Sequence, residues 1–109
     1  MNRTLCMAFL MLGMLAVPFS LTWAGESQAL LAKGVKIYGE SKCVMCHIIQ
    51  GKGGKFGPDL SHVGAKKDAQ WLRQIVKDPK ADNPKSRMPP FRGSDADLDA
   101  LTAYLRSLK

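Results

Sequence analysis

The stretch Cys43-Val44-Met45-Cys46-His47 decides how the rest of this 109-residue chain is interpreted. Its two cysteines are separated by two residues, so on a helical backbone their thiols lie about one turn apart. A histidine follows the second cysteine directly. This spacing suits several kinds of site, and the remainder of the chain distinguishes among them.

The five-residue pattern is typical of covalent c-type haem attachment. Two thiols one turn apart can add to the vinyl groups of neighbouring pyrrole rings, and the histidine then lies beneath the iron. We therefore predict one haem c, bound covalently through Cys43 and Cys46, with His47 as an iron ligand.

Three alternatives use the same residues. A zinc site would also recruit His62, but a histidine fifteen residues after His47 misses the usual zinc spacing. A thiol-disulfide oxidoreductase needs alternating strands and helices, which the sequence does not indicate. A single disulfide between Cys43 and Cys46 would close a loop too short to stabilise the fold much. Haem attachment is the favoured interpretation.

The second axial position of the iron has three candidates, Met45, Met88 and His62. Met45 lies between the attachment cysteines and cannot reach the opposite face of the haem. Met88 lies in the stretch Ser86-Arg87-Met88-Pro89-Pro90-Phe91, where prolines stiffen a loop that can fold over that face. Its soft thioether favours ferrous iron. We predict Met88 as the second ligand, with His62 as the competitor.

The N-terminus has the order of a secretory signal. Arg3 is followed by the apolar run 5–17, and small residues precede a cleavage point after Ala24. We expect residues 1–24 to be a signal peptide and residues 25–109 to form one exported, periplasmic domain; an uncleaved membrane anchor is the alternative. The cleaved chain would have no membrane span.

The predicted mature domain is basic. Without Arg3 it keeps 15 of the 16 Lys and Arg against nine Asp and Glu, a net charge of about +6. Export would separate the domain from nucleic acid, whereas acidic proteins are attracted to such a charge. The candidate docking residues form a collar around the haem edge: Lys42, Lys52, Lys55, Lys85 and Arg87.

The hydrophobic spacing predicts an all-α domain. Helices are expected over 28–41, with Ser27 as the cap, over 69–77, capped by Asp68 and stopped by Asp78-Pro79, and from a Ser94 cap through Leu108. The glycine-rich segment 50–57 is expected to be a loop, and the prolines of 79–90 an extended path. Gly34 in the first helix suggests that another helix crosses closely there.

In residues 27–109 the chain resembles the small bacterial class I c-type cytochromes. The landmarks, in order, are Gly34, Ile37 and Tyr38, the Cys43–His47 motif, Gly57 to Leu60, Trp71-Leu72, Met88-Pro89, and Leu101 with Tyr104-Leu105. The resemblance implies three main helices around one haem, the first and last crossing near Gly34. It also implies a hydrogen bond from His47 to the carbonyl of Pro58, Trp71 near a haem propionate, and Leu60 and Phe91 lining the pocket.

These observations predict a monomeric one-electron carrier rather than an enzyme. Its partners would be redox proteins with acidic docking surfaces. Two alternatives remain open: a haem subunit of a larger redox complex, and a haem sensor or peroxidase whose iron keeps an open position.

Overall fold

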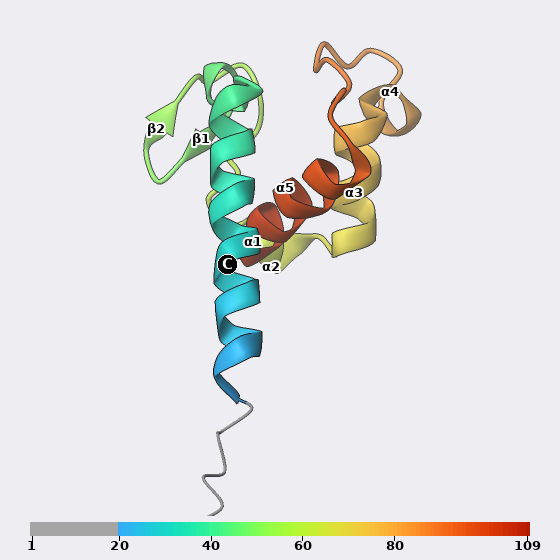
Figure 1. The fold of residues 1–109 in the computed structure, drawn as a ribbon. Coiled ribbons are helices and arrows are strands. Elements are labelled where there is room, and N and C mark those ends of the chain that lie inside the picture. The colour runs from blue at the N-terminus through green and yellow to red at the C-terminus, as the bar shows by residue number, and fades with distance from the viewer. Residues whose placement is uncertain (1–19) are drawn as a thin grey trace, which may run out of the picture.

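The computed structural model describes the backbone of residues 20–109 and the side chains of residues 27–109. Most of the predicted signal peptide, 1–24, therefore lies outside the described residues. The described elements follow in this order (Figure 1): α1 (Ser20–Glu40), the 3-10 turn η1 (Cys43–Met45), β1 (Ile48–Ile49), β2 (Lys52–Gly53), α2 (Val63–Lys66), α3 (Ala69–Lys77), α4 (Pro79–Asp82) and α5 (Asp95–Ser107).

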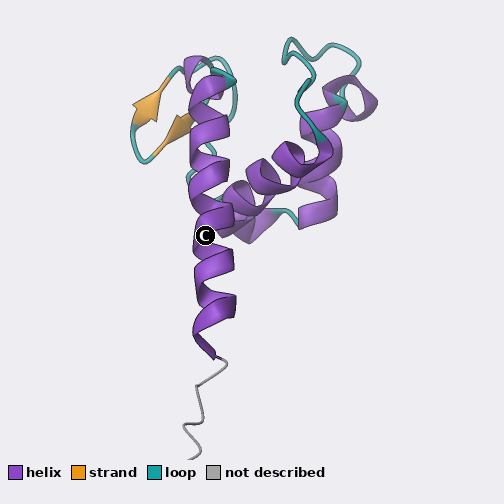
Figure 2. Ribbon diagram, in the orientation of Figure 1, coloured by secondary structure: helices purple, strands orange, loops and turns teal. Residues whose placement is uncertain are grey.

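Helices make up most of this part of the chain, as Figure 2 shows, and the predicted all-α class is correct. None of the helices in the described part combines the length and the apolar composition that a membrane crossing requires.

The core lies where α1 and α3 pack against α5. Leu72 and Leu101 are its largest fully buried side chains. Each helix turns one apolar face inward, so the three faces share a single interior. The buried apolar residues are Ile37, Tyr38, Leu72, Val76, Leu98, Ala100, Leu101 and Leu105.

The crossing of α1 and α5 occurs at Gly34, as predicted. A Cβ on Gly34 would overlap the carbonyl oxygen of Ala100 and lie 2.6 Å from Cβ of Tyr104. One turn further along α1, the rings of Tyr38 and Tyr104 meet edge to face, with centroids 5.8 Å apart. The absence of a side chain at residue 34 therefore lets the two backbones approach closely.

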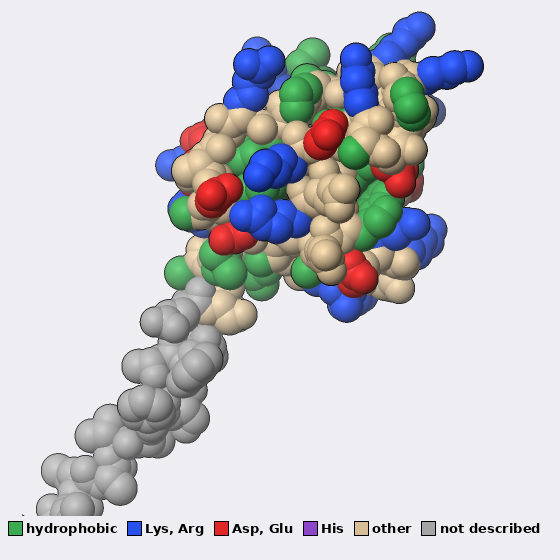
Figure 3. Space-filling view, turned by 90° about the vertical axis from the view of Figure 1, so that its right-hand side faces the viewer, with side chains coloured by type: hydrophobic (Ala, Val, Ile, Leu, Met, Phe, Trp, Pro, Cys, Tyr) green, Lys and Arg blue, Asp and Glu red, His purple; other side chains and the backbone are tan. Residues whose placement is uncertain are grey.

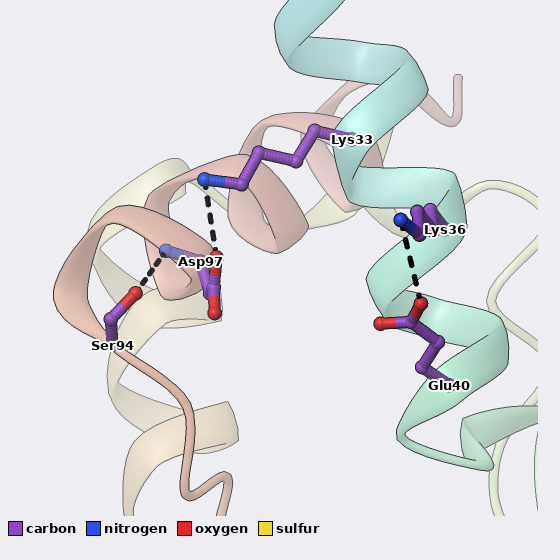
Figure 4. Close-up of polar contacts among 5 residues, drawn as sticks. All are labelled: Lys33, Lys36, Glu40, Ser94 and Asp97. Atoms are coloured by element: carbon purple, nitrogen blue, oxygen red, sulfur yellow. Dashed lines mark hydrogen bonds and ion pairs between the residues drawn. The ribbon is translucent and has the colours of Figure 1, made fainter.

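Two of the three predicted helix caps are present, those at Asp68 and Ser94. The backbone N–H of Trp71 donates to the Asp68 carboxylate at 2.8 Å, and that of Asp97 donates to the Ser94 hydroxyl at 3.1 Å. Asp97 also accepts from the Lys33 ammonium at 3.1 Å, which ties the start of α5 to α1 (Figure 4). This contact holds the pKa of Asp97 below its usual value.

The first helix begins earlier than predicted. α1 starts at Ser20 instead of Gln28, so Ser27 lies within the helix rather than at its cap. No proline interrupts residues 20–40, and helical hydrogen bonding can therefore propagate through them. The helix includes the last residues before the predicted cleavage point.

Segment 50–57 was expected to be a loop without a strand, and that expectation is wrong in part. β1 pairs with β2 in an antiparallel ladder, Ile48 opposite Gly53 and Ile49 opposite Lys52. Gln50 and Gly51, which connect them, both have positive φ, at 51° and 77°. Two consecutive residues of this kind make the tight turn that suits a hairpin.

The proline-rich stretch is also not extended throughout. Pro79 begins the short helix α4, because proline lacks only an N–H that the first turn of a helix does not use. From Asn83 to Gly93 the chain is non-helical, as predicted. Its far end is tied to α3, since the backbone N–H of Phe91 donates to the carbonyl of Val76 at 3.0 Å.

Candidate functional site

His47 follows the 3-10 turn that carries the cysteines, and its side chain is largely buried, at 9% exposure. Its Nδ1 lies 2.8 Å from the carbonyl oxygen of Pro58. A carbonyl only accepts, so Nδ1 carries the hydrogen and Nε2 keeps a free lone pair. The predicted contact with Pro58 therefore leaves His47 oriented and ready to bind a metal through Nε2.

Gly57 completes the seat of His47. A Cβ at Gly57 would lie 2.6 Å from Cε1 of the imidazole, and the Gly57 N–H donates to the carbonyl of Cys46 at 2.7 Å. The segment that ends the glycine-rich stretch thus lies directly against the ring. Sequence reasoning gave Gly57 no such role, because close approach between residues ten apart leaves no local signal.

The two cysteines have different surroundings. Cys43 is half-buried and Cys46 is exposed, and both are free thiols. Burial raises the pKa of the Cys43 thiol above its usual value. Among the described residues no three His, Cys, Asp or Glu side chains are grouped as a metal site of that kind would require, so the arrangement needed for the zinc alternative is not formed.

Partly buried apolar side chains surround the buried core on several elements. Among the predicted site residues, Leu60, Trp71, Met88 and Phe91 belong to this set, whereas Pro58 is exposed and contributes its carbonyl. Lys67 stacks over the ring of Trp71, 4.4 Å from its centroid. Two further members, Ile49 and Val63, were missed, because no periodic pattern marks them in the sequence.

Met88 lies in the non-helical segment 83–93. Its side chain is half-buried against the core, and its backbone N–H donates to the Ser86 hydroxyl at 3.3 Å. Figure 1 shows this segment and the η1–hairpin region at the same end of the molecule, one at its right and the other at its left. Met88 and His47 therefore come from opposing segments.

His62, the competing iron ligand, lies elsewhere. It precedes α2, and its exposed ring contacts the carbonyl of Lys109 through Nδ1 at 2.8 Å. The neighbouring Gly64 N–H donates to the carbonyl of Leu108 at 2.6 Å. In Figure 1, α2 lies away from η1 and the hairpin. The structure thus places His62 against the chain's last residues.

These residues fit a covalently attached haem. The group requires free thiols, an axial imidazole with its metal-binding nitrogen available, and apolar side chains to cover the macrocycle. The thiols are those of Cys43 and Cys46, and the imidazole is that of His47, held by Pro58. The partly buried apolar side chains provide the cover.

The surface carries the basic charge expected from the sequence. All five residues proposed as a docking collar are exposed. Figure 3 views the side that includes α3 and α4, and several Lys and Arg side chains extend from its upper edge.

Comparison with known proteins agrees with this geometry. The sequence model of the family described as "Cytochrome c" matches residues 31–109. Cytochrome c oxidase subunit 2 of Alkalihalophilus pseudofirmus is 29% identical over 92 residues, which are 76% of this chain and 27% of that protein. The chain therefore spans about a quarter of this relative's length.

Two solved structures share the fold. The c-type cytochrome SorU from Sinorhizobium meliloti is 25% identical with a TM-score of 0.58, and the match covers 74% of this chain and 92% of that one. SoxXA from P. pantotrophus is 23% identical with a TM-score of 0.61, and the match covers 72% and 80%. Because the family match extends over most of the chain and includes the Cys43–His47 motif, this protein belongs to the cytochrome c family.

Proposed function

We propose that this protein is a periplasmic one-electron carrier with one haem, attached through Cys43 and Cys46 and ligated by His47 and Met88. The observation that carries the proposal is the contact between His47 Nδ1 and the Pro58 carbonyl, which leaves Nε2 free for iron. The haem, when bound, supplies a centre that gains and loses a single electron.

The protein's own residues set the properties of that centre. The Pro58 carbonyl fixes the His47 ring and raises its basicity. A thioether ligand from Met88 favours the ferrous state and raises the reduction potential. His47 and Met88 would together leave the iron no open position for a substrate, which suits electron transfer better than catalysis on a bound substrate. The apolar side chains limit the access of water.

Spectroelectrochemistry of the haem-loaded protein tests the axial assignment. Met88→Ala should abolish the methionine-to-iron charge-transfer band of the oxidised protein and lower the potential. Met45→Ala is the matched control, since Met45 is 64% exposed and adjoins the same motif. It should change neither property, and His62→Ala should behave likewise. A low potential that shifts with His62→Ala and is indifferent to Met88→Ala would overturn the assignment. A five-coordinate wild-type iron would support the sensor or peroxidase alternative.

A second candidate function is that of a haem subunit in a larger redox complex. It is favoured by the similarity to a segment of cytochrome c oxidase subunit 2, a protein of which this chain spans about a quarter. Size-exclusion chromatography of extracts from the native cells distinguishes the two. A free carrier elutes as a small monomer, whereas a subunit elutes with its complex and is released only by detergent or high salt.

A further inference from the structure

Phe56 is the most exposed large apolar side chain described, at 94%. The ring lies in the segment that connects the hairpin to Pro58, and it contributes almost nothing to the core. A single exposed apolar residue is common on protein surfaces. Phe56, however, belongs to a segment that is bonded to a turn with two further exposed apolar side chains.

Backbone hydrogen bonds hold the Phe56 segment against η1. The Gly54 N–H donates to the carbonyl of Val44 at 2.8 Å, and the Gly57 N–H donates to that of Cys46 at 2.7 Å. Residue 56 is therefore fixed between two points on the haem-attachment turn. On that turn, Val44 and Met45 are themselves 39% and 64% exposed. We call Val44, Met45 and Phe56 the anchor patch.

The surroundings of the anchor patch are basic. Lys42, Lys52 and Lys55 are exposed, and no Asp or Glu occurs in residues 41–58. The acidic residues that flank this stretch are engaged elsewhere: Glu40 pairs with Lys36, and Asp59 accepts from the backbone of Ser61. Within residues 27–109, none of the three lysines forms an ion pair. Their charge is available to a partner.

We propose that the anchor patch docks a redox protein whose surface carries an apolar hollow bordered by Asp and Glu, with Phe56 as the residue that enters the hollow. This inference rests on the proposed carrier function and deepens it. Aromatic side chains that are buried at the centre of an interface, inside a rim of contacts that excludes water, commonly dominate its affinity. The three lysines supply the complementary charge and speed the encounter.

The position of the patch favours a redox protein as its partner over a lipid surface or a second copy of this chain. Val44 and Met45 lie between the two haem-attachment cysteines, so a partner seated on them lies beside the haem. A lipid surface gains nothing from that proximity. In a second copy of this chain, three lysines would face three lysines.

A chemically defined surface can serve as the probe of this docking. Gold electrodes are coated either with a mixed monolayer of carboxylate-ended and methyl-ended thiols or with carboxylate-ended thiols alone. The haem-loaded wild type, Phe56→Ala and Leu30→Ala are compared by adsorption and by voltammetry. Leu30 is the matched control, because it is a 41% exposed apolar residue on α1, outside the patch.

On the mixed monolayer, Phe56→Ala should bind about ten- to a hundredfold more weakly than the wild type, because a buried aromatic side chain is lost. On the carboxylate monolayer the two should bind equally, since the lysines are unchanged. Leu30→Ala should match the wild type on both. Equal binding of Phe56→Ala and the wild type on the mixed surface would overturn the inference.

Two further measurements separate the other occupants. Tight, Phe56-dependent binding of the wild type to vesicles of equal parts phosphatidylcholine and phosphatidylglycerol would assign the patch to a membrane surface. A concentration-dependent dimer that Phe56→Ala abolishes in sedimentation would assign it to a second copy. Either result overturns docking to a redox protein. The carrier function fails separately, if the dissolved wild type gives no reversible one-electron wave.

Discussion

Gly34→Ala is the most direct test of how α1 and α5 are packed. The added methyl group would overlap the Ala100 carbonyl oxygen and lie 2.6 Å from Cβ of Tyr104, where ordinary contacts begin at 3.4 Å. The Ala100 oxygen belongs to the backbone of α5. The overlap is therefore relieved only by moving one helix relative to the other, which loosens the contacts around it.

The expected cost follows from two opposing terms. Overpacking a core costs about 1–3 kcal/mol, and an obstacle formed by backbone places this site near 3. Alanine in place of glycine within a helix recovers about 1 kcal/mol. The free energy of unfolding should therefore fall by about 2 kcal/mol, a large part of the roughly 5–15 kcal/mol typical of a native domain.

Guanidinium denaturation followed by far-ultraviolet circular dichroism measures this change in the haem-loaded protein. The midpoint for Gly34→Ala should fall by roughly 0.5–1 M. Gly39→Ala is the control on the same helix, because no atom lies within 4 Å of its added Cβ. Its free energy of unfolding should rise by about 0.5–1 kcal/mol. A Gly34→Ala protein as stable as the wild type would refute the reasoning about the crossing.

Three other substitutions test the burial of Tyr38, the Lys33–Asp97 pair and the seat of His47. Burial raises the pKa of Tyr38 to about 12 from 10.0, so its contribution to stability is present below pH 10 and is lost as the pH rises through about 12. The buried Tyr38 hydroxyl has no hydrogen-bond partner among the described residues. In denaturation experiments, Tyr38→Phe should therefore abolish this alkaline loss and raise the free energy of unfolding by about 1 kcal/mol at neutral pH. The Lys33 contact lowers the pKa of Asp97 below 3.8, so Asp97→Asn should reduce the denaturation midpoint at neutral pH, and the difference should vanish as the pH falls through that lowered value. Gly57→Ala should displace the imidazole of His47 from the Pro58 carbonyl, which makes the ring less basic, and should therefore raise the reduction potential measured by spectroelectrochemistry.

Each of these expectations has an outcome that contradicts it. A less stable Tyr38→Phe protein would mean that the hydroxyl has a partner once the haem is attached. If Asp97→Asn lowered the stability equally at low and at neutral pH, the charge of Asp97 would not be the cause. An unchanged potential in Gly57→Ala would show that the His47 ring tolerates a shift of its neighbouring backbone.

The fold could be predicted where its signals are local. The caps Asp68 and Ser94 act within three residues of their partners, and both helices begin where those residues indicate. The hairpin was missed because its strands are two residues long and its turn is Gln50-Gly51 rather than the more familiar Asn-Gly. The helix at Pro79 was missed because proline signals the end of one helix and also permits the start of the next.

The candidate site divides in the same way. The haem-attachment motif is contiguous, so Cys43, Cys46 and His47 are visible in the sequence alone. The bond between His47 and Pro58 spans eleven residues and was expected only from the family resemblance. Ile49 and Val63 join the apolar surroundings only after folding, and no periodic pattern marks them beforehand.

The pairing of α1 with α5 has a consequence for the order of events during the proposed export. The two helices are separated by more than fifty residues, so the core closes only after residues 95–107 have crossed the membrane. The Cys43–His47 motif is complete long before that point. Both thiols are therefore presented on an open chain, accessible to an attachment enzyme and to oxidants alike. Delivery of the haem during this interval would let the closing helices fold around a group already in place.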